Sequence, residues 1–421
     1  PYWAVKPSAR RKVLGAFSQR MGDVAHRNSK QPAILIHAVS VGEINATRAM
    51  IESLLQERPE LHVIVSTTTQ TGYERGQQLY NSSPHVTVIR YPLDFSAAVA
   101  RVLDAVRPDL VVLMELEVWP NFMQQCMRRK IPVVLANGRL TSSSFKRYKL
   151  VKPIAGTMFG RLARVCAQDD TYAGRFEKLG VPRDRILVTS TMKYDTAPIA
   201  DRVEGDLELA QALGLQPERE PIWVCGSTGP GEEQIILREY RNLLATFRRL
   251  RLVIVPRKPE RFNLVADLIE RFRFNVLRRS RNDSPPVDPP VPPVILGDTM
   301  GELRKFYSLA DVVFVGRSLV DLGPRQHGSD MIEPAALAKP VIVGPYTGNF
   351  DQAVRALRAE DAILEVVDDE TLAESVRVLI STPAEAAAMG QRAQRVVRRQ
   401  QGATRRHVDV ILGLLKTAKA A

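Results

Sequence analysis

A carboxylate, Glu43, follows the apolar run Ile34–Ile36 after a turn of small residues at Ala38–Gly42. Ligands of open α/β sheets bind outside the carboxyl ends of the strands, so a carboxylate in this place could act as a general base. Ser40 and Glu43 also have the spacing of a capping box, in which the glutamate reaches back to the cap amide. The segment alone leaves both interpretations open, a catalytic base or a helix cap.

Two further carboxylates, Glu115 and Glu117, follow the apolar run Leu110–Leu113, which is typical of a parallel strand buried on both faces. They would point to the same side if the strand continued through them. We group them with Glu43 as catalytic candidates and expect them to orient an acceptor or Glu43. Lys193 is the fourth candidate, because it could face a nucleotide across a crevice, although it could equally be a solvated lysine.

Four junctions in the second half place small residues or a capping group ahead of a helix, where free amides and the helix dipole attract anions. They suit a nucleotide, whose phosphate takes amides and whose ribose diol takes a carboxylate. Three of these junctions contain our candidates for nucleotide-sugar binding, which are Ser227, Thr228, Thr299, Met300, Gly301, Glu302 and Glu333. The remaining junction is Gly316–Leu319.

Each junction also has a structural interpretation. Thr299 and Glu302 fit a capping box, Glu333 could cap its own helix, and Pro334 suits the first helical position. Arg257 ends an apolar run and could bind a phosphate with both arms of its guanidinium, or it could be a solvated arginine.

Short runs rich in valine and isoleucine alternate with helix-length segments, which predicts a parallel, doubly wound α/β sheet. The pattern restarts near residue 221, so we expect two Rossmann-like domains, at 1–200 and 201–421. Strands are expected at 33–37, 62–66, 86–90, 110–113, 133–136, 164–167 and 186–188, then at 222–225, 252–255, 275–277, 294–296, 312–315, 340–343 and 363–367. Helices are expected at 45–57, 71–80, 96–106, 232–247, 259–272, 300–308, 334–338, 349–358 and 384–419, and a polyproline-like loop at 284–293.

The composition of the chain and its missing motifs indicate which classes of partner and function to expect. Lys and Arg number 59 against 46 Asp and Glu, a formal net charge of +13 that favours anionic partners. The three cysteines form no CxxC pair and the histidines no HExxH pattern, so we expect no metal site and a reducing compartment. No GxGxxG turn or P-loop supports a dinucleotide oxidoreductase or an NTPase. A nucleic-acid-binding protein is the rival class, but no RRM, KH or helix-turn-helix signature supports it.

The candidate stretches as an ordered set resemble the 3-deoxy-D-manno-octulosonic acid (Kdo) transferases of lipopolysaccharide assembly. The matching stretches are His37–Glu43, Glu115–Asn121, Asn137–Leu140, Met192–Asp195, Gly226–Thr228, Val255–Phe262, Gly297–Leu303 and Glu333–Ala336. One match would be weak, whereas the ordered set is specific.

The resemblance implies the GT-B fold, in which two Rossmann-like domains face each other across a cleft. It implies an inverting transferase that moves Kdo from CMP-Kdo to a lipid A precursor, with Glu43 as the base and the nucleotide on the second domain. The acceptor would bind the first domain, and we assign Gly42, Arg139 and Lys146 to it, with Lys12, Arg147 and Lys149 as further bases for acidic phosphates and head groups. The alternative is another GT-B enzyme, such as a UDP-sugar transferase or a UDP-sugar 2-epimerase.

The resemblance also implies the cytoplasmic face of the bacterial inner membrane, an anionic surface, with an N-terminal anchor ahead of Pro1. We expect no cofactor besides the donor CMP-Kdo, and no nucleic-acid partner. The chain departs from the family pattern at Gly316-Arg317-Ser318-Leu319, where the family has a glycine-glycine-serine-leucine turn, and around His327, where it has a Gly-Gly-His-Asn stretch.

Overall fold

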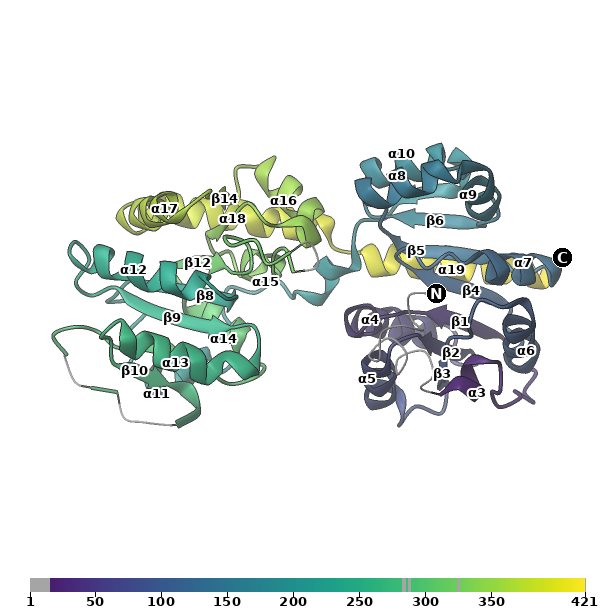
Figure 1. Ribbon diagram of the computed structural model, residues 1–421, viewed down its shortest axis with the longest axis horizontal. Helices are drawn as coiled ribbons and strands as arrows, with labels where there is room; N and C mark the ends of the chain where they lie inside the picture. Colours follow the sequence, from purple (N-terminus) through teal and green to yellow (C-terminus); the bar gives the residue numbers. More distant parts are fainter. Residues whose placement is uncertain (1–15, 282–284, 287–288, 324–325, 421) are drawn as a thin grey trace. The chain divides into compact units, whose positions relative to one another are not determined.

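The chain forms two compact α/β units (Figure 1). A computed structural model describes residues 16–281, 285–286, 289–323 and 326–420. The first unit consists of Pro1–Thr196 together with Gln401–Ala421, and the second of Ala197–Gln400. Lys12 and the residues before it lie outside the described part of the chain.

The first unit contains a parallel seven-stranded sheet in the order β3-β2-β1-β4-β5-β6-β7. Its strands are β1 (Ala33–His37), β2 (His62–Thr67), β3 (Val86–Arg90), β4 (Leu110–Met114), β5 (Val133–Gly138), β6 (Arg164–Ala167) and β7 (Ile186–Val188). Its helices are α3 (Phe17–Arg20), α4 (Val41–Glu57), α5 (Gln70–Tyr80), α6 (Ser96–Val106), α7 (Pro120–Arg128), α8 (Ser142–Leu150), α9 (Lys152–Phe159), α10 (Asp170–Lys178) and α19 (Ala403–Ala420), with the 3-10 turns η1 (Arg183–Arg185) and η2 (Met192–Thr196).

Strand β1 shows how this sheet is covered on both faces. All five of its residues are buried. Ala33 and Leu35 belong to one apolar cluster and Ile34 and Ile36 to the other, because successive side chains of a strand point to opposite faces. A continuous apolar run therefore marks a strand with helices on both sides, as the sequence predicts.

The second unit contains another parallel seven-stranded sheet, in the order β10-β11-β9-β8-β12-β13-β14. Its strands are β8 (Ile222–Thr228), β9 (Arg251–Pro256), β10 (Val276–Arg278), β11 (Val294–Leu296), β12 (Val312–Val315), β13 (Val341–Val343) and β14 (Leu364–Glu365). Its helices are α11 (Asp206–Ala212), α12 (Glu232–Leu244), α13 (Phe262–Arg271), α14 (Leu303–Leu309), α15 (Ile332–Ala336), α16 (Asp351–Arg358), α17 (Asp369–Ser381) and α18 (Pro383–Gln400), with the 3-10 turns η3 (Pro259–Arg261), η4 (Arg279–Arg281) and η5 (Gly348–Phe350).

Several helices begin at a side-chain cap. The hydroxyls of Ser40, Thr69 and Thr141 accept hydrogen bonds from amides in the first turns of α4, α5 and α8. The carboxylates of Asp169 and Asp368 do the same for α10 and α17. Such caps satisfy amides that have no partner within the helix, and each stabilises a helix by about 1 kcal/mol.

The C-terminal segment differs from the prediction in two ways. The single helix expected at 384–419 is wrong, since it is broken between α18 and α19 at Gly402, whose φ of 84° lies in the left-handed region. The prediction that 401–421 belongs to the second domain is also wrong. Helix α19 packs against α4, β4 and β5 of the first unit (yellow in Figure 1), and its Val408 and Ile411 are buried there.

The strand order fixes where a ligand site should lie in each unit. In the first sheet the chain runs from β1 outward to β2 and β3, then returns to place β4 on the other side of β1. In the second sheet, β8 and β12 have the same relation. The loops after such a strand pair diverge and leave a crevice at the carboxyl ends of the strands.

The proline-rich segment 284–293 was predicted to be a loop. Its residues 284, 287 and 288 lie outside the described part of the chain, and the others contain no helix or strand. Proline cannot donate a ladder hydrogen bond, which accounts for this irregular backbone.

Candidate functional site

Glu43 lies in the first turn of α4, directly after β1, at the crevice of the first sheet. Ser40 caps the helix, since its hydroxyl accepts from the Glu43 amide at 3.3 Å and donates to Glu43 Oε1 at 2.8 Å. The Val39 amide donates to Glu43 Oε2 at 2.9 Å. The cap and the carboxylate therefore form one structure, and the two interpretations of this segment are compatible.

The surroundings of Glu43 favour its protonated form. Burial, and then the neighbouring carboxylate of Glu115, raises the pKa of Glu43 to about 7. Hydrogen bonds from Val39 and Ser40 oppose the shift and Glu117 adds to it. A carboxylate with a pKa near the working pH can both take and hold a proton, as a general base requires.

Glu115 and Glu117 follow β4, the strand beside β1. They were expected to point to one side if the strand continued, but the strand does not continue, because β4 ends at Met114 and Glu115 has a φ of 53°. This turn brings the charge of Glu115 toward Glu43. The Trp119 indole donates to Glu117 Oε2 at 3.0 Å, and burial raises the pKa of Glu117, with Glu115 contributing. The three carboxylates thus form one interacting group.

The remaining candidates of the first unit lie in different elements and loops. Gly42 is exposed in the first turn of α4, and Lys146 is exposed on α8. Arg139 directly follows β5, and its amide donates to the Glu115 carbonyl at 3.3 Å. Lys193 lies in η2, the last element before the chain enters the second unit. The structure therefore brings Arg139 to the carboxylate group, whereas Lys146 lies on a neighbouring helix.

In the second unit, β8 ends in a kinked segment that was predicted to bind the nucleotide. Ser227 has a φ of 57°, and the Thr228 hydroxyl donates to Glu233 Oε1 at 2.7 Å. Thr228 is fully buried, so this hydroxyl holds the loop to α12. A Cβ at Gly226 would lie 2.2 Å from Tyr307 Oη, so only glycine fits beside that ring.

A buried carboxylate that the sequence did not single out organises this edge. Glu232 accepts amide hydrogen bonds from Gly229 at 2.7 Å and from Arg317, Ser318 and Leu319 at 2.6, 2.8 and 2.9 Å. It thereby fastens the loop after β12 to the loop after β8. The signal in the sequence was a glutamate directly after the turn Gly229–Gly231, and the side chain of this glutamate is fully buried.

Arg257 and Glu333 approach this crevice from two sides. Arg257 follows β9, and its amide donates to the Thr228 carbonyl at 3.1 Å. Burial raises the pKa of Glu333 to about 7, with Asp330 adding to the shift and Arg304 and Arg257 opposing it. The expectation that Pro334 opens its helix is wrong, since α15 starts at Ile332, and the N-cap residue of this helix, Met331, makes no side-chain cap hydrogen bond.

The stretch Thr299–Glu302 has a different local structure from the one predicted. Helix α14 begins at Leu303, so the expectation of a helix from Met300 is wrong, and Met300 and Gly301 lie in the loop before it. The Thr299 hydroxyl donates to Glu302, which also pairs with Arg279 at 3.1 Å. Burial acts to raise the pKa of Glu302, but Thr299 and Arg279 together lower this pKa below its usual value. Glu302 therefore stays a carboxylate.

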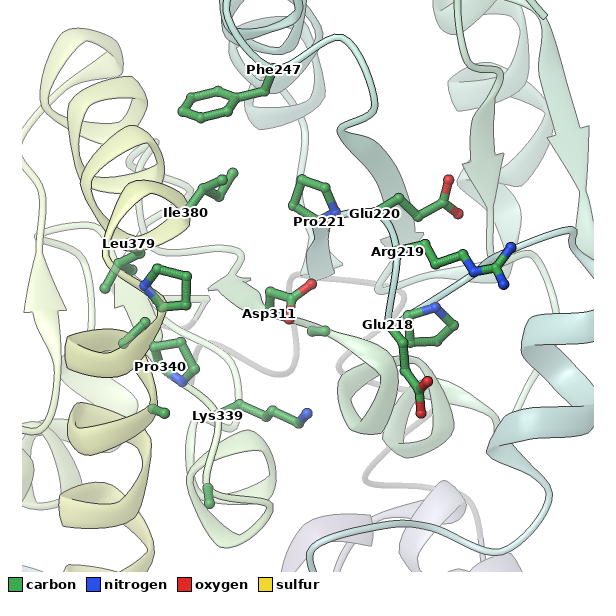
Figure 2. A pocket seen from close by; sticks show the side chains of 16 residues that line it. Glu218, Arg219, Glu220, Pro221, Phe247, Asp311, Lys339, Pro340, Leu379 and Ile380 are labelled. Carbon is green, nitrogen blue, oxygen red and sulfur yellow. The ribbon is translucent and has the colours of Figure 1, made fainter. Parts of the chain in front are cut away.

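A cavity of about 510 Å³ lies in the second unit (Figure 2). Its lining includes Pro221, Asp311 and Pro340, which directly precede β8, β12 and β13. The cavity is therefore at the amino ends of the strands, while the candidate residues follow the carboxyl ends. It is no part of the candidate site.

The described residues contain no group of three or more His, Cys, Asp or Glu side chains placed to hold a metal ion. A search of the same residues finds no helix with the length and apolar character needed to cross a bilayer. Cys126, Cys166 and Cys225 are buried and unpaired.

Comparison with known proteins agrees with this geometry. Residues 15–196 match the family described as "3-Deoxy-D-manno-octulosonic-acid transferase (kdotransferase)". A 3-deoxy-D-manno-octulosonic acid transferase of Haemophilus influenzae is 36% identical over 399 residues, 94% of this chain and 90% of that protein. One of Bordetella pertussis is 32% identical over 385 residues, 90% of this chain and 86% of that protein.

Among solved structures, a glycosyltransferase from Rickettsia africae matches with a TM-score of 0.58 and 13% identity, covering 92% of this chain and 100% of that one. At this identity the likeness shows the fold, and the predicted GT-B class is confirmed by it together with the two parallel sheets. The family assignment rests on the relatives found by sequence. The chain belongs to the 3-deoxy-D-manno-octulosonic acid transferase family and is a glycosyltransferase.

Proposed function

We propose that this protein transfers Kdo from CMP-Kdo to a lipid A precursor with inversion, using Glu43 as the general base. The observation that carries the proposal is the pKa of Glu43, raised to about 7 by burial and by Glu115 at the crevice of the first sheet. A surface carboxylate used only as a helix cap would need no such environment. A base with this pKa can accept the proton of a sugar hydroxyl during the attack.

The reaction is a single displacement at the anomeric carbon of Kdo. The acceptor hydroxyl loses its proton to Glu43 while its oxygen forms the new glycosidic bond. The bond to the phosphate breaks on the opposite face, and CMP departs with the bonding electrons. The glycosyl centre is oxocarbenium-like at the transition state, so nearby carboxylates stabilise it, and Glu115 and Glu117 supply negative charge in addition to orienting the acceptor.

The departing CMP gains negative charge, which the second unit is built to receive. Arg257 supplies a guanidinium for the phosphate, and the backbone at Ser227 and at Met300–Gly301 supplies amides. We assign Glu333 to the ribose diol, because its carboxyl group is half-buried beside the crevice.

The acceptor is a phosphorylated lipid, so the first unit must meet a membrane surface. Helices α8 and α9 meet at a corner where Leu150 is 86% exposed and Ile154 63% exposed. Lys146 and Lys149 are exposed on the same helix as Leu150. Apolar side chains bordered by lysines suit an anionic leaflet, so we assign membrane contact to this corner.

Replacing Leu150 and Ile154 together with aspartate should weaken binding to vesicles of phosphatidylglycerol and phosphatidylethanolamine by about tenfold or more, because two apolar side chains no longer enter the bilayer. Co-sedimentation with the vesicles measures this. Leu264→Asp is the matched control, since Leu264 is 65% exposed on α13 of the second unit. Equal losses in both proteins would argue against the assignment.

The test of the function is to incubate the protein with CMP-Kdo and a tetraacyl lipid A precursor and to follow the mass of the glycolipid. We expect the mass to increase by whole Kdo units. A folded protein that binds CMP but adds no Kdo would refute the acceptor assignment and indicate another glycosyltransferase. A protein that binds no CMP would refute the donor as well.

A further inference from the structure

Arg317 occupies a backbone position that does not suit an arginine. Its φ is 58°, in the left-handed region, which costs a residue with a side chain about 1 kcal/mol. The residue stands directly after Gly316, in the loop that follows β12, where the family pattern has a second glycine. A strained arginine in place of a permissive glycine calls for a compensating role of its side chain.

The side chain of Arg317 has no ion-pair partner among the described residues. Its Nε atom is buried without a hydrogen bond, and neither Arg317 nor Arg257 forms an ion pair within the described residues. Three other arginines of this unit are ion-paired, as in Arg261–Glu233, Arg278–Asp298 and Arg279–Glu302. Arg317 and Arg257 are thus among the described guanidinium groups that have no ion-pair partner.

These two guanidinium groups are close enough to act on each other. Burial, and then the charge of Arg257, lowers the pKa of Arg317, with Glu232 opposing. Like charges repel, and a half-buried guanidinium without a partner loses hydration. An arrangement of this kind is stable once an anion lies between or beside the two groups.

The backbone of Arg317 is held in place. Glu232 accepts the amides of Arg317 and Ser318, and the Gly328 amide donates to the Arg317 carbonyl at 2.6 Å. The stem of the side chain passes Gly229, where a Cβ would lie 3.0 Å from Arg317 Cγ. A guanidinium on a fixed stem loses little conformational entropy on binding, which suits a group that selects among ligands.

The proposed donor carries two anionic groups on one atom, since its anomeric carbon bears both the phosphate and the carboxylate of the ulosonic acid. We propose that Arg317 binds the sugar carboxylate of CMP-Kdo while Arg257 binds its phosphate, which makes Arg317 a residue that determines donor specificity. This inference rests on the proposed function. A sugar nucleotide without a carboxylate would leave the Arg317 guanidinium unpaired, and this disfavours neutral sugars.

The experiment measures dissociation constants for CMP and for CMP-Kdo by titration calorimetry without acceptor, in wild type, Arg317→Gln and Arg317→Gly. The readout is the ratio of the CMP constant to the CMP-Kdo constant. We expect both variants to lower this ratio by about 10- to 100-fold, the equivalent of one charge-assisted hydrogen-bonded pair. Arg317→Gly also removes the backbone strain, so a loss of folding would not explain its result.

Three control variants make the result specific. Arg317→Lys keeps the charge and should restore part of the ratio. Arg257→Gln should weaken CMP and CMP-Kdo together, because both ligands contain the phosphate. Arg249→Gln removes the same charge at the amino end of β9, where it is exposed, and should change neither constant.

An unchanged ratio in Arg317→Gln would overturn the proposal, whether the two affinities fall together, as for a phosphate contact, or stay as in wild type. The proposed function fails in a separate measurement, the transfer of Kdo to the lipid, because the binding experiment contains no acceptor.

Discussion

Replacing Glu43 with glutamine should lower the rate of Kdo transfer by about 100- to 10,000-fold, the range that a general base contributes. Glutamine keeps the shape of the side chain, and its carbonyl oxygen can still accept from the Val39 amide. The helix cap made by Ser40 is also retained. We therefore expect the thermal unfolding and the CMP affinity of Glu43→Gln to match those of wild type while the turnover number falls.

The pH dependence gives an independent measure of the same residue. The pKa of Glu43 is raised to about 7, so the base is protonated and inactive below this pH, and kcat/KM should rise through pH 7. Glu115→Gln removes a charge that raises this pKa and should move the midpoint of the rise to lower pH. A midpoint that does not move in Glu115→Gln, or a Glu43→Gln enzyme that keeps wild-type turnover, would show that another group takes the proton.

Replacing Glu232 with alanine should destabilise the second unit by about 4 kcal/mol, because four amides lose their acceptor at a site closed to solvent. The loops after β8 and β12 would separate, so CMP affinity should fall as well. Denaturant unfolding followed by the fluorescence of Trp223, which is fully buried in this unit, measures the loss. Trp3 and Trp119 are first replaced by phenylalanine, so that Trp223 is the only tryptophan left.

Glu370→Ala is the matched control for this variant. Glu370 also lies in the first turn of a helix, α17, but it is exposed, and its loss should change the unfolding free energy by less than about 0.5 kcal/mol. A Glu232→Ala protein as stable as this control would mean that water satisfies the four amides.

The sequence predicted the sheets better than the ends of the elements. Buried parallel strands such as Ala33–His37 and Val312–Val315 were identified to the residue, because a short apolar run with turns on both sides is typical of a strand buried on both faces. Helix starts were less accurate. The helix after Glu302 begins three residues later than predicted, since Thr299 and Arg279 hold that side chain in the loop.

The candidate site was predicted in outline and missed in detail. Glu43, Glu115 and Glu117 were placed at one sheet edge because each follows a strand, and the strand order brings β1 and β4 together. The roles of Glu232 and Arg317 depend on contacts between loops 85 or more positions apart, as in the bond from the Arg317 amide to Glu232. No local pattern encodes such a pairing.

The return of α19 to the first unit affects the order in which the two units can fold during synthesis. Val408, Ile411 and Leu415 belong to the same apolar cluster as Ile34 and Ile36. A ribosome synthesises all of Ala197–Gln400 before it reaches α19, so the second unit has its whole sequence available first. Domains of nascent chains generally fold from the N-terminus onward. We expect the reverse order here, because the first sheet exposes an apolar face, which a chaperone could bind, until α19 has been synthesised.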